Sequence, residues 1–229
     1  MHIPDGYLSP QTCAVLAGGS VPFLIRAFIW IRKRLSSKVI PILALTAALS
    51  FIIQMFNIPL PGGTTGHAVG GTLIAALVGP WPAVIGVSIV LIIQALIFGD
   101  GGILALGANI LNMAVILPLA GYWLYRLMAG KSGIASPRRI ISVVIASYIA
   151  LNLAALAAAV EFGIQPALFR DAAGAPLYCP YGLSVAIPAM MIGHLAIAGI
   201  AEAILTGAVF WFVARNFPDR IRIDEEAVK

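Results

Sequence analysis

Residues 11–34, QTCAVLAGGSVPFLIRAFIWIRKR, decide the fold class of this chain. The segment from Gln11 to Ile31 contains one charged residue, Arg26, and is long enough for a membrane-spanning helix, which needs about 20 mainly apolar residues. Three basic residues, Arg32 to Arg34, follow the segment, whereas only the charge of Asp5 precedes it. Basic residues gather on the cytoplasmic side of a membrane, and a secretory signal has the opposite order of charge and apolar run. We therefore expect an uncleaved first helix whose N-terminus lies outside the cytoplasm.

The composition extends this interpretation to the whole chain. Hydrophobic residues make up 61% of its 229 residues, charged residues make up only 10%, and the mean hydropathy is +1.00. About a quarter of the residues of a soluble domain are charged, so we predict an integral membrane protein with one domain of six or seven spanning helices. The placement of the +5 net charge indicates topology and not nucleic-acid binding. Cys13 and Cys179 form no CxxC pair and are interpreted as small buried hydrophobic residues.

Six further apolar runs follow the first one. They extend over Val39–Phe56, Ala68–Val78, Ala83–Phe98, Ile103–Met128, Ile140–Phe162 and Ser184–Ala214. Seven crossings from an outside start place most basic residues in the cytoplasm: Arg32, Lys33, Arg34, Lys38, Arg126, Lys131, Arg138, Arg139, Arg215, Arg220, Arg222 and Lys229. Arg170 stays outside, and Arg26 lies above the inner boundary, where its stem can snorkel. We therefore predict an all-α integral membrane protein, a bundle of seven transmembrane helices with its N-terminus outside and its C-terminus inside.

Two stretches between these runs are harder to assign. The run Ala68–Val78 is short for a crossing, so its helix either begins earlier, within the glycine-rich residues 62–67, or is tilted. Residues 79–82, Gly-Pro-Trp-Pro, are expected to form a tight turn on the inner side. Residues 99–102 are expected to form a second turn on the outer side, and the longest outer loop covers about residues 163–182.

The first five residues, MHIPD, offer an unusual set of nitrogen ligands. The Met1 amine, the His2 backbone amide and the His2 ring can chelate one ion and would occupy three corners of a plane. A fourth nitrogen would complete a planar site, which favours Ni(II) or Cu(II) over the tetrahedral preference of Zn(II). Pro4 stiffens the segment, and the bulk of His2 hinders removal of Met1. The alternative is a disordered terminus that happens to carry a histidine.

His67 is the best candidate for the fourth nitrogen. The topology places His2 and His67 at the same face of the membrane, and glycines beside His67 allow another part of the backbone to approach closely. Taken alone, a histidine near a helix start is more often a solvated or capping residue. That alternative stays open at this point.

Other polar residues lie deeper in the predicted bundle. His194 falls near the middle of the last span, and the amides Gln94, Asn109, Asn112 and Asn152 fall mainly in the outer half. These residues either hydrogen-bond to metal ligands and orient them, without binding the metal themselves, or simply form hydrogen bonds between helices. Glu202 is either a proton or partner site or is neutralised by Arg26. The sequence lacks the HExxH metalloprotease motif and the phosphate-binding P-loop, so neither an intramembrane enzyme nor a self-powered ATPase is indicated.

Three segments closely resemble the CbiM/NikM family, the substrate-capture components of energy-coupling factor transporters for cobalt and nickel. They are residues 1–10 (MHIPDGYLSP), 66–73 (GHAVGGTL) and 77–81 (LVGPW). The resemblance covers nearly the whole chain and includes His194 and Glu202. It implies that Met1, His2 and His67 hold the metal, and this chain departs from the family pattern at none of these positions. Nickel and cobalt members share these ligands, so the resemblance leaves open whether Ni2+ or Co2+ is the substrate.

The same resemblance implies how the single transmembrane domain, residues 1–229, is divided. Residues 1–10 would form an extracytoplasmic metal-binding hook, residues 11–34 an extra N-terminal helix, residues 38–214 a six-helix capture core and residues 215–229 a cytoplasmic tail. The implied partners are a transmembrane coupling protein, two ATPase subunits and, in many members, a small accessory membrane protein. The implied location is the cell inner or plasma membrane. The main alternative is a self-sufficient metal channel or permease that uses His194 and Glu202 as a path.

Overall fold

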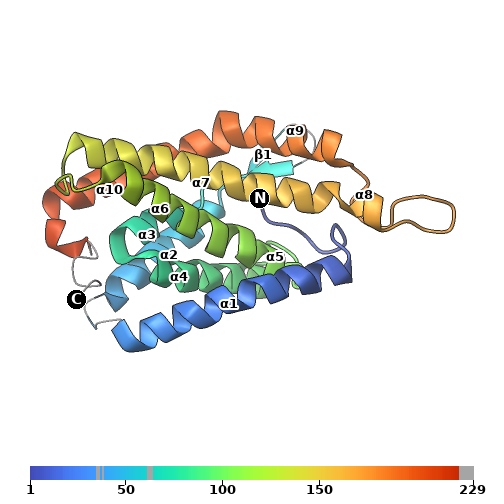
Figure 1. Cartoon of the computed structure of the whole chain (residues 1–229), viewed down its shortest axis with the longest axis horizontal. Helices are drawn as coiled ribbons and strands as arrows, with labels where there is room; N and C mark the ends of the chain where they lie inside the picture. Colours follow the sequence, from blue (N-terminus) through green and yellow to red (C-terminus); the bar gives the residue numbers. More distant parts are fainter. Residues whose placement is uncertain (35–36, 38, 61–63, 222–229) are drawn as a thin grey trace.

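Helices make up most of the residues that this computed structural model describes, which are 1–34, 37, 39–60 and 64–221. Among these described residues, five helical rods are long and apolar enough to cross a membrane: Pro10–Arg34, Pro80–Phe98, Leu106–Ala129, Pro137–Leu168 and Leu183–Asn216. A shorter apolar helix, α2, covers Ile40–Gln54. These rods lie side by side along the long axis of the molecule (Figure 1). They confirm an all-α, multi-pass membrane protein.

The rods contain the following named elements. The first is α1 (Pro10–Arg34), the second joins α4 (Pro80–Ile93) to η1 (Gln94–Phe98), and the third joins α5 (Leu106–Asn109), η2 (Ile110–Ile116) and α6 (Leu117–Ala129). The fourth joins α7 (Pro137–Gly163) to α8 (Gln165–Leu168), and the fifth joins α9 (Leu183–Gly193), η3 (His194–Ala198) and α10 (Gly199–Asn216). A short 3₁₀ turn, η4, covers Pro218–Arg220. The elements η1, η2 and η3 are π-helical bulges, a feature that occurs frequently at functional sites.

The third apolar run forms a helix of only eight residues, α3 (Gly71–Val78). At a rise of about 1.5 Å per residue such a helix spans about 12 Å, well short of the roughly 30 Å hydrocarbon core of a bilayer. The expectation that this helix begins earlier is wrong, because β2 (Thr64–Gly66) precedes it and pairs antiparallel with β1 (Ile58–Leu60). All eight residues of α3 are buried, so it is an inner helix surrounded by the longer rods.

Two other sequence expectations are corrected by the helix boundaries. Residues 80–82 do not belong to a turn, because α4 begins at Pro80. Proline suits the first helical position, where its missing N–H would have no partner in the helix anyway. Only Gly79, with φ +100, makes the turn between α3 and α4. The outer loop after Gly163 contains α8 and an isolated bridge between Arg170 and Pro176.

Buried alanines on α7 allow the neighbouring helices to pack closely against it. Ala146, Ala150, Ala154 and Ala158, spaced four residues apart, are all fully buried. Residues at this spacing lie on one face of a helix, and small side chains there let α6, α9 and α10 approach α7.

The basic residues of the described helices gather at one end of the bundle. The last turn of α1 carries Arg32, Lys33 and Arg34, and the last turns of α6 and α10 carry Arg126 and Arg215. These three helix ends and the start of α7 lie at the same end of the molecule, opposite the loop after α8 (Figure 1). Lys38, Arg222 and Lys229, which were also expected on the cytoplasmic side, lie outside the described residues.

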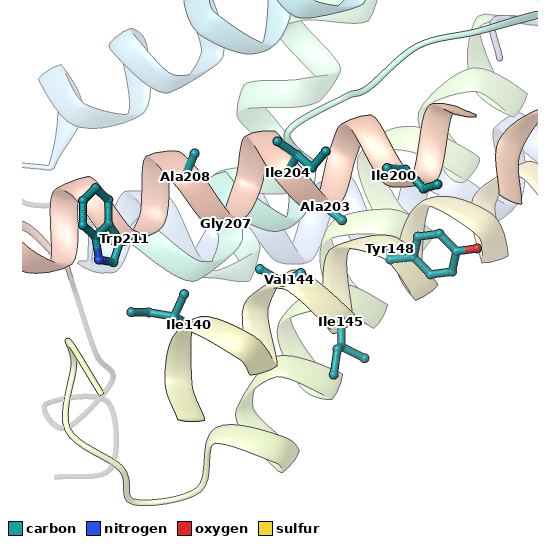
Figure 2. A pocket seen from close by; sticks show the side chains of 10 residues that line it. All are labelled: Ile140, Val144, Ile145, Tyr148, Ile200, Ala203, Ile204, Gly207, Ala208 and Trp211. Atoms are coloured by element: carbon teal, nitrogen blue, oxygen red, sulfur yellow. The ribbon is translucent and has the colours of Figure 1, made fainter. Parts of the chain in front are cut away.

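A large apolar groove runs between α7 and α10. It has a volume of about 630 Å³, and Figure 2 shows that its walls include Val144, Tyr148, Ala203, Gly207 and Trp211. The lining is almost wholly apolar and includes no charged side chain. This groove therefore lies apart from the polar centre described next.

Candidate metal centre

The chain terminus is folded into the bundle. Met1 is 3% exposed and Ile3 is fully buried, so the terminal hook, residues 1–10, is not a disordered end. The side-chain amide of Asn109 binds both backbone groups of Ile3. The Ile3 N–H donates to Asn109 Oδ1 at 2.8 Å, and the Ile3 carbonyl oxygen accepts from Asn109 Nδ2 at 3.1 Å. The same carbonyl oxygen accepts from the Gly102 N–H at 2.9 Å.

Asp5 anchors the other side of the hook. Its carboxylate accepts hydrogen bonds from the backbone N–H groups of Ile103, Leu104 and Ala105 at 3.0, 3.0 and 3.1 Å. These groups precede α5 and would otherwise lack partners. A side chain at Gly102 would overlap Asp5, so only glycine allows this close approach.

The structure brings His2 and His67 together. His2 Nδ1 lies 3.0 Å from His67 Nε2, and the two rings stack with their centroids 4.7 Å apart. The Met1 amine donates to the carbonyl oxygen of Thr65 at 2.8 Å, two residues before His67. The structure thus gathers the three residues expected to bind metal in one region, although they are up to 66 residues apart in the sequence.

The outer nitrogens of both rings have their own partners. His2 Nε2 lies 3.2 Å from Gln94 Oε1, and His67 Nδ1 lies 3.0 Å from the carbonyl oxygen of Ala68. Both oxygens are acceptors, which favours the tautomers that carry the ring proton on these outer nitrogens. In those tautomers the two facing nitrogens, His2 Nδ1 and His67 Nε2, both have a free lone pair. This arrangement favours a cation between them, as in metal sites where a hydrogen bond to the second nitrogen fixes the histidine tautomer.

Burial keeps the Met1 amine and the two imidazoles of the centre uncharged. Burial lowers the pKa of the Met1 amine from 8.0 to about 5, although the nearby Asp100 carboxylate opposes the shift. Burial and then the positive charge of the Met1 amine lower the pKa of His2 from 6.5 to about 4. The same two causes hold the pKa of His67 well below 6.5. At neutral pH these nitrogens are therefore free to bind a metal without first losing a proton.

Only some of the predicted amides surround this centre. Gln94 and Asn109 contact the hook, whereas Asn112 donates to Glu161 at 2.8 Å and Asn152 donates to the carbonyl oxygen of Tyr148 on its own helix. Sequence reasoning missed Asp100, whose carboxylate lies 3.4 Å from His2 Nδ1, and the anchoring role of Asp5. The glycines on both sides of Asp100 were the available signal, because they permit a tight turn towards the hook.

The two deep residues of the last rod behave differently from each other. His194 Nδ1 lies 2.8 Å from the carbonyl oxygen of Met190, and its buried Nε2 has no hydrogen-bond partner within the described part of the chain. Glu202 is not neutralised by Arg26, because its carboxylate accepts backbone hydrogen bonds from Val69 and Gly70. The Arg26 guanidinium lies instead over the ring of Trp81, 5.7 Å from its centroid.

The described residues contain no group of three or more His, Cys, Asp or Glu side chains that could hold a metal ion. The centre of the terminal hook instead combines two imidazoles with the terminal amine. A cavity of about 510 Å³, lined in part by Met1, His2, Tyr7 and Phe162, lies beside it. The fold and this centre define a multi-pass membrane protein with a nitrogen-rich site at its own N-terminus.

Comparisons with known proteins identify the family. Residues 2–220 match the family model of CbiM, the cobalt uptake substrate-specific transmembrane region. The chain is 54% identical to the fused nickel transport protein NikMN of Rhodobacter capsulatus over 96% of its own length and 63% of that protein. It is 45% identical to a putative metal transport protein of Methanocaldococcus jannaschii, over 100% of this chain and 98% of the other.

A solved structure supports the same assignment. The crystal structure of a truncated transition metal transporter superimposes with a TM-score of 0.89 at 53% identity and covers 94% of this chain and 99% of that one. The chain belongs to the CbiM/NikM family of cobalt and nickel transporter components. It spans 63% and 66% of the lengths of two fused nickel transport proteins that it matches, those of Rhodobacter capsulatus and Lactiplantibacillus plantarum.

Proposed function

We propose that this chain is the substrate-capture subunit of an ATP-driven energy-coupling factor transporter. Its substrate would be a divalent transition metal taken up from outside the cell, Ni2+ in the first place and Co2+ in the second. Family membership supports a role in metal uptake, and two relatives with 54% and 49% identity are named as nickel transport proteins. No enzymatic role is proposed, because the family consists of transporter components.

The observation that carries this proposal is the pair of facing imidazole nitrogens. Two ligands at neighbouring corners of a square plane, each about 2.0 Å from the metal, lie about 2.8 Å apart. The 3.0 Å between His2 Nδ1 and His67 Nε2 is close to this value. The Met1 amine and the His2 amide would supply the other two corners. A planar set of four nitrogens favours Ni(II) over Zn(II).

The membrane orientation and the partners are part of the same proposal. The chain would cross or enter the membrane as seven helices, with the basic end of the bundle in the cytoplasm and the hook on the outer side. The described residues contain no recognisable phosphate-binding loop, so two ATPase subunits and a transmembrane coupling protein would provide energy and movement. A small accessory membrane protein would complete the assembly.

An insertion of one alanine between Met1 and His2 tests the terminal chelate. We expect nickel binding, measured by equilibrium dialysis of the purified protein, to be lost because the insertion breaks the fused chelate rings. An alanine inserted between Ala173 and Gly174, in the exposed outer loop, serves as the control and should leave binding unchanged. Equal affinity in the wild type and the Met1–His2 insertion variant would refute the terminal site.

Two further measurements separate the proposal from its alternatives. The nickel-loaded protein should be diamagnetic, as expected of a low-spin planar d8 ion, and a paramagnetic octahedral signal would contradict the four-nitrogen site. Liposomes that contain this chain alone should not accumulate nickel. ATP-independent uptake by such liposomes would support a self-sufficient channel or permease instead.

A further inference from the structure

A single buried carboxylate holds the backbone directly after His67. Glu202, on α10, is fully buried. Its Oε2 accepts from the Val69 N–H at 2.7 Å and from the Gly70 N–H at 2.9 Å, and its Oε1 lies 3.2 Å from the same Gly70 nitrogen. Both carboxylate oxygens therefore face the main chain, and neither is directed at the metal centre.

The local backbone explains why a carboxylate is needed at this position. Gly70, with φ +75, caps the N-terminus of α3, and no side chain of its own segment satisfies the first N–H groups. Water cannot do so, because residues 66–78 are buried. A helix N-terminus also carries partial positive charge, which a carboxylate stabilises. Glu202, on α10, thus accepts hydrogen bonds from backbone N–H groups at the start of α3 that have no partner within their own segment.

A second helix holds the same segment from α2. The Ser50 hydroxyl donates to the carbonyl oxygen of Val69 at 2.6 Å, and Gln54 Nε2 donates to the Ser50 hydroxyl at 2.9 Å. All three side chains are buried. The N–H and the C=O of Val69 are therefore fixed by α10 and α2 respectively, which leaves the segment little freedom to shift.

Only Ala68 separates this fixed segment from His67. The carbonyl oxygen of Ala68 is also the partner of His67 Nδ1, so the backbone that Glu202 holds sets both the position and the tautomer of the imidazole. We infer that Glu202 is a positioning residue for the metal ligand His67 and joins α10 to the metal centre. This inference rests on the proposed function of the centre and adds a residue that lies outside the ligand set.

The position of Glu202 on α10 indicates how movement of this helix would reach the metal centre. Ala203 and Ile204, the two residues that follow it, line the apolar groove between α7 and α10 (Figure 2). Glu202 is directed the other way, into the bundle. A displacement of α10 would therefore be transmitted through one carboxylate to His67, which provides a route by which movement of a helix could weaken metal binding.

The test uses Glu202→Ala, Glu202→Gln and a matched control, Glu161→Gln. Glu161 is also a buried carboxylate of a long helix, but its partner is Asn112 and not the segment after His67. Nickel dissociation constants are measured by equilibrium dialysis on the purified full chain, with elution volume and thermal stability recorded for each variant. We expect Glu202→Ala to weaken binding about 10- to 100-fold, the range typical for groups that orient metal ligands. Glu202→Gln, which keeps one acceptor oxygen, should weaken it less, and Glu161→Gln should change it less than about threefold.

A double-mutant cycle with His67→Ala separates positioning from general destabilisation. If Glu202 acts through His67, the effect of Glu202→Ala on nickel affinity disappears once His67 is absent. X-ray absorption of the nickel-loaded Glu202→Ala protein should also show one imidazole fewer than the wild type. Equal losses in both backgrounds, or an unchanged ligand set in Glu202→Ala, would overturn the positioning role.

The proposed function can fail independently of this result. If the Met1–His2 insertion variant binds nickel as tightly as the wild type, the metal centre is refuted, and the role of Glu202 is refuted with it. If the insertion abolishes nickel binding but Glu202→Ala keeps the affinity and the spectrum of the wild type, only the role of Glu202 is refuted.

Discussion

Replacement of Asn109 by leucine tests whether docking of the terminal hook controls metal affinity. Asn109 is 2% exposed and is bound to Ile3 through both its oxygen and its nitrogen. Leucine has a similar volume but can make neither hydrogen bond. The Ile3 carbonyl oxygen would keep the N–H of Gly102, whereas the Ile3 N–H would remain buried without a partner.

The expected loss of nickel affinity in Asn109→Leu follows from the unpaired Ile3 N–H. A buried donor without a partner costs about 1–3 kcal/mol. The hook bears Met1 and His2 immediately before Ile3, so this cost falls on the docked arrangement that binds the metal. A coupling of about 1–3 kcal/mol corresponds to an affinity about 5- to 150-fold weaker.

Equilibrium dialysis with nickel, or calorimetric titration in detergent, measures this loss. Asn152→Leu is the matched control, because Asn152 is 7% exposed and its hydrogen-bond partner among the described residues is Tyr148, on its own helix. It should bind nickel within about threefold of the wild type. A wild-type affinity in Asn109→Leu, in protein that elutes and melts normally, would show that the docked hook is not what sets metal binding.

Three further outcomes are expected. His67→Ala should lose most of the nickel affinity because one of four ligands is removed, and wild-type uptake in that variant would exclude His67 from the site. Gly102→Ala should weaken binding about tenfold or more, because its methyl group overlaps Asp5 and displaces the hook. Gly182→Ala, with nothing within 4 Å, should leave binding unchanged, and equal dialysis results for the two variants would contradict the close approach. Nickel binding at pH 7 should release about one proton, from the His2 amide, and not about two, because the buried Met1 amine has a pKa of about 5 and is already neutral. Titration in buffers of different ionisation enthalpy counts these protons, and a release of two would show that the amine is still protonated.

The pH dependence has a definite sign. The pKa of the Met1 amine is lowered by docking from 8.0 to about 5, so the docked hook binds fewer protons than the free hook between these values. Docking is therefore favoured at high pH and loses up to about 1.4 kcal/mol per pH unit as the pH falls from 8 to 5. The lowered pKa of His2 adds to this loss below about pH 6.5. An amine of ordinary pKa would instead still carry, at neutral pH, a proton that the metal must displace.

The sequence was sufficient for the fold class and for the ligand candidates. Long apolar segments must be helical in a bilayer, because their backbone groups have no water to bind, and the amine, amide and imidazole of Met1–His2 are neighbours by covalent structure. Hydropathy could not show that α3 is an inner helix of eight residues, because a buried helix and a spanning one are equally apolar.

Tertiary structure alone decided which polar groups surround the hook. Asn109 and Asn112 look alike in the sequence, yet one holds Ile3 and the other binds Glu161. The π-bulge η2 begins between them. Glu202 reaches the segment after His67 across more than 130 residues of sequence. Local patterns fix helices and covalent chelates, whereas contacts between distant segments depend on how the rods pack, and no single segment contains that information.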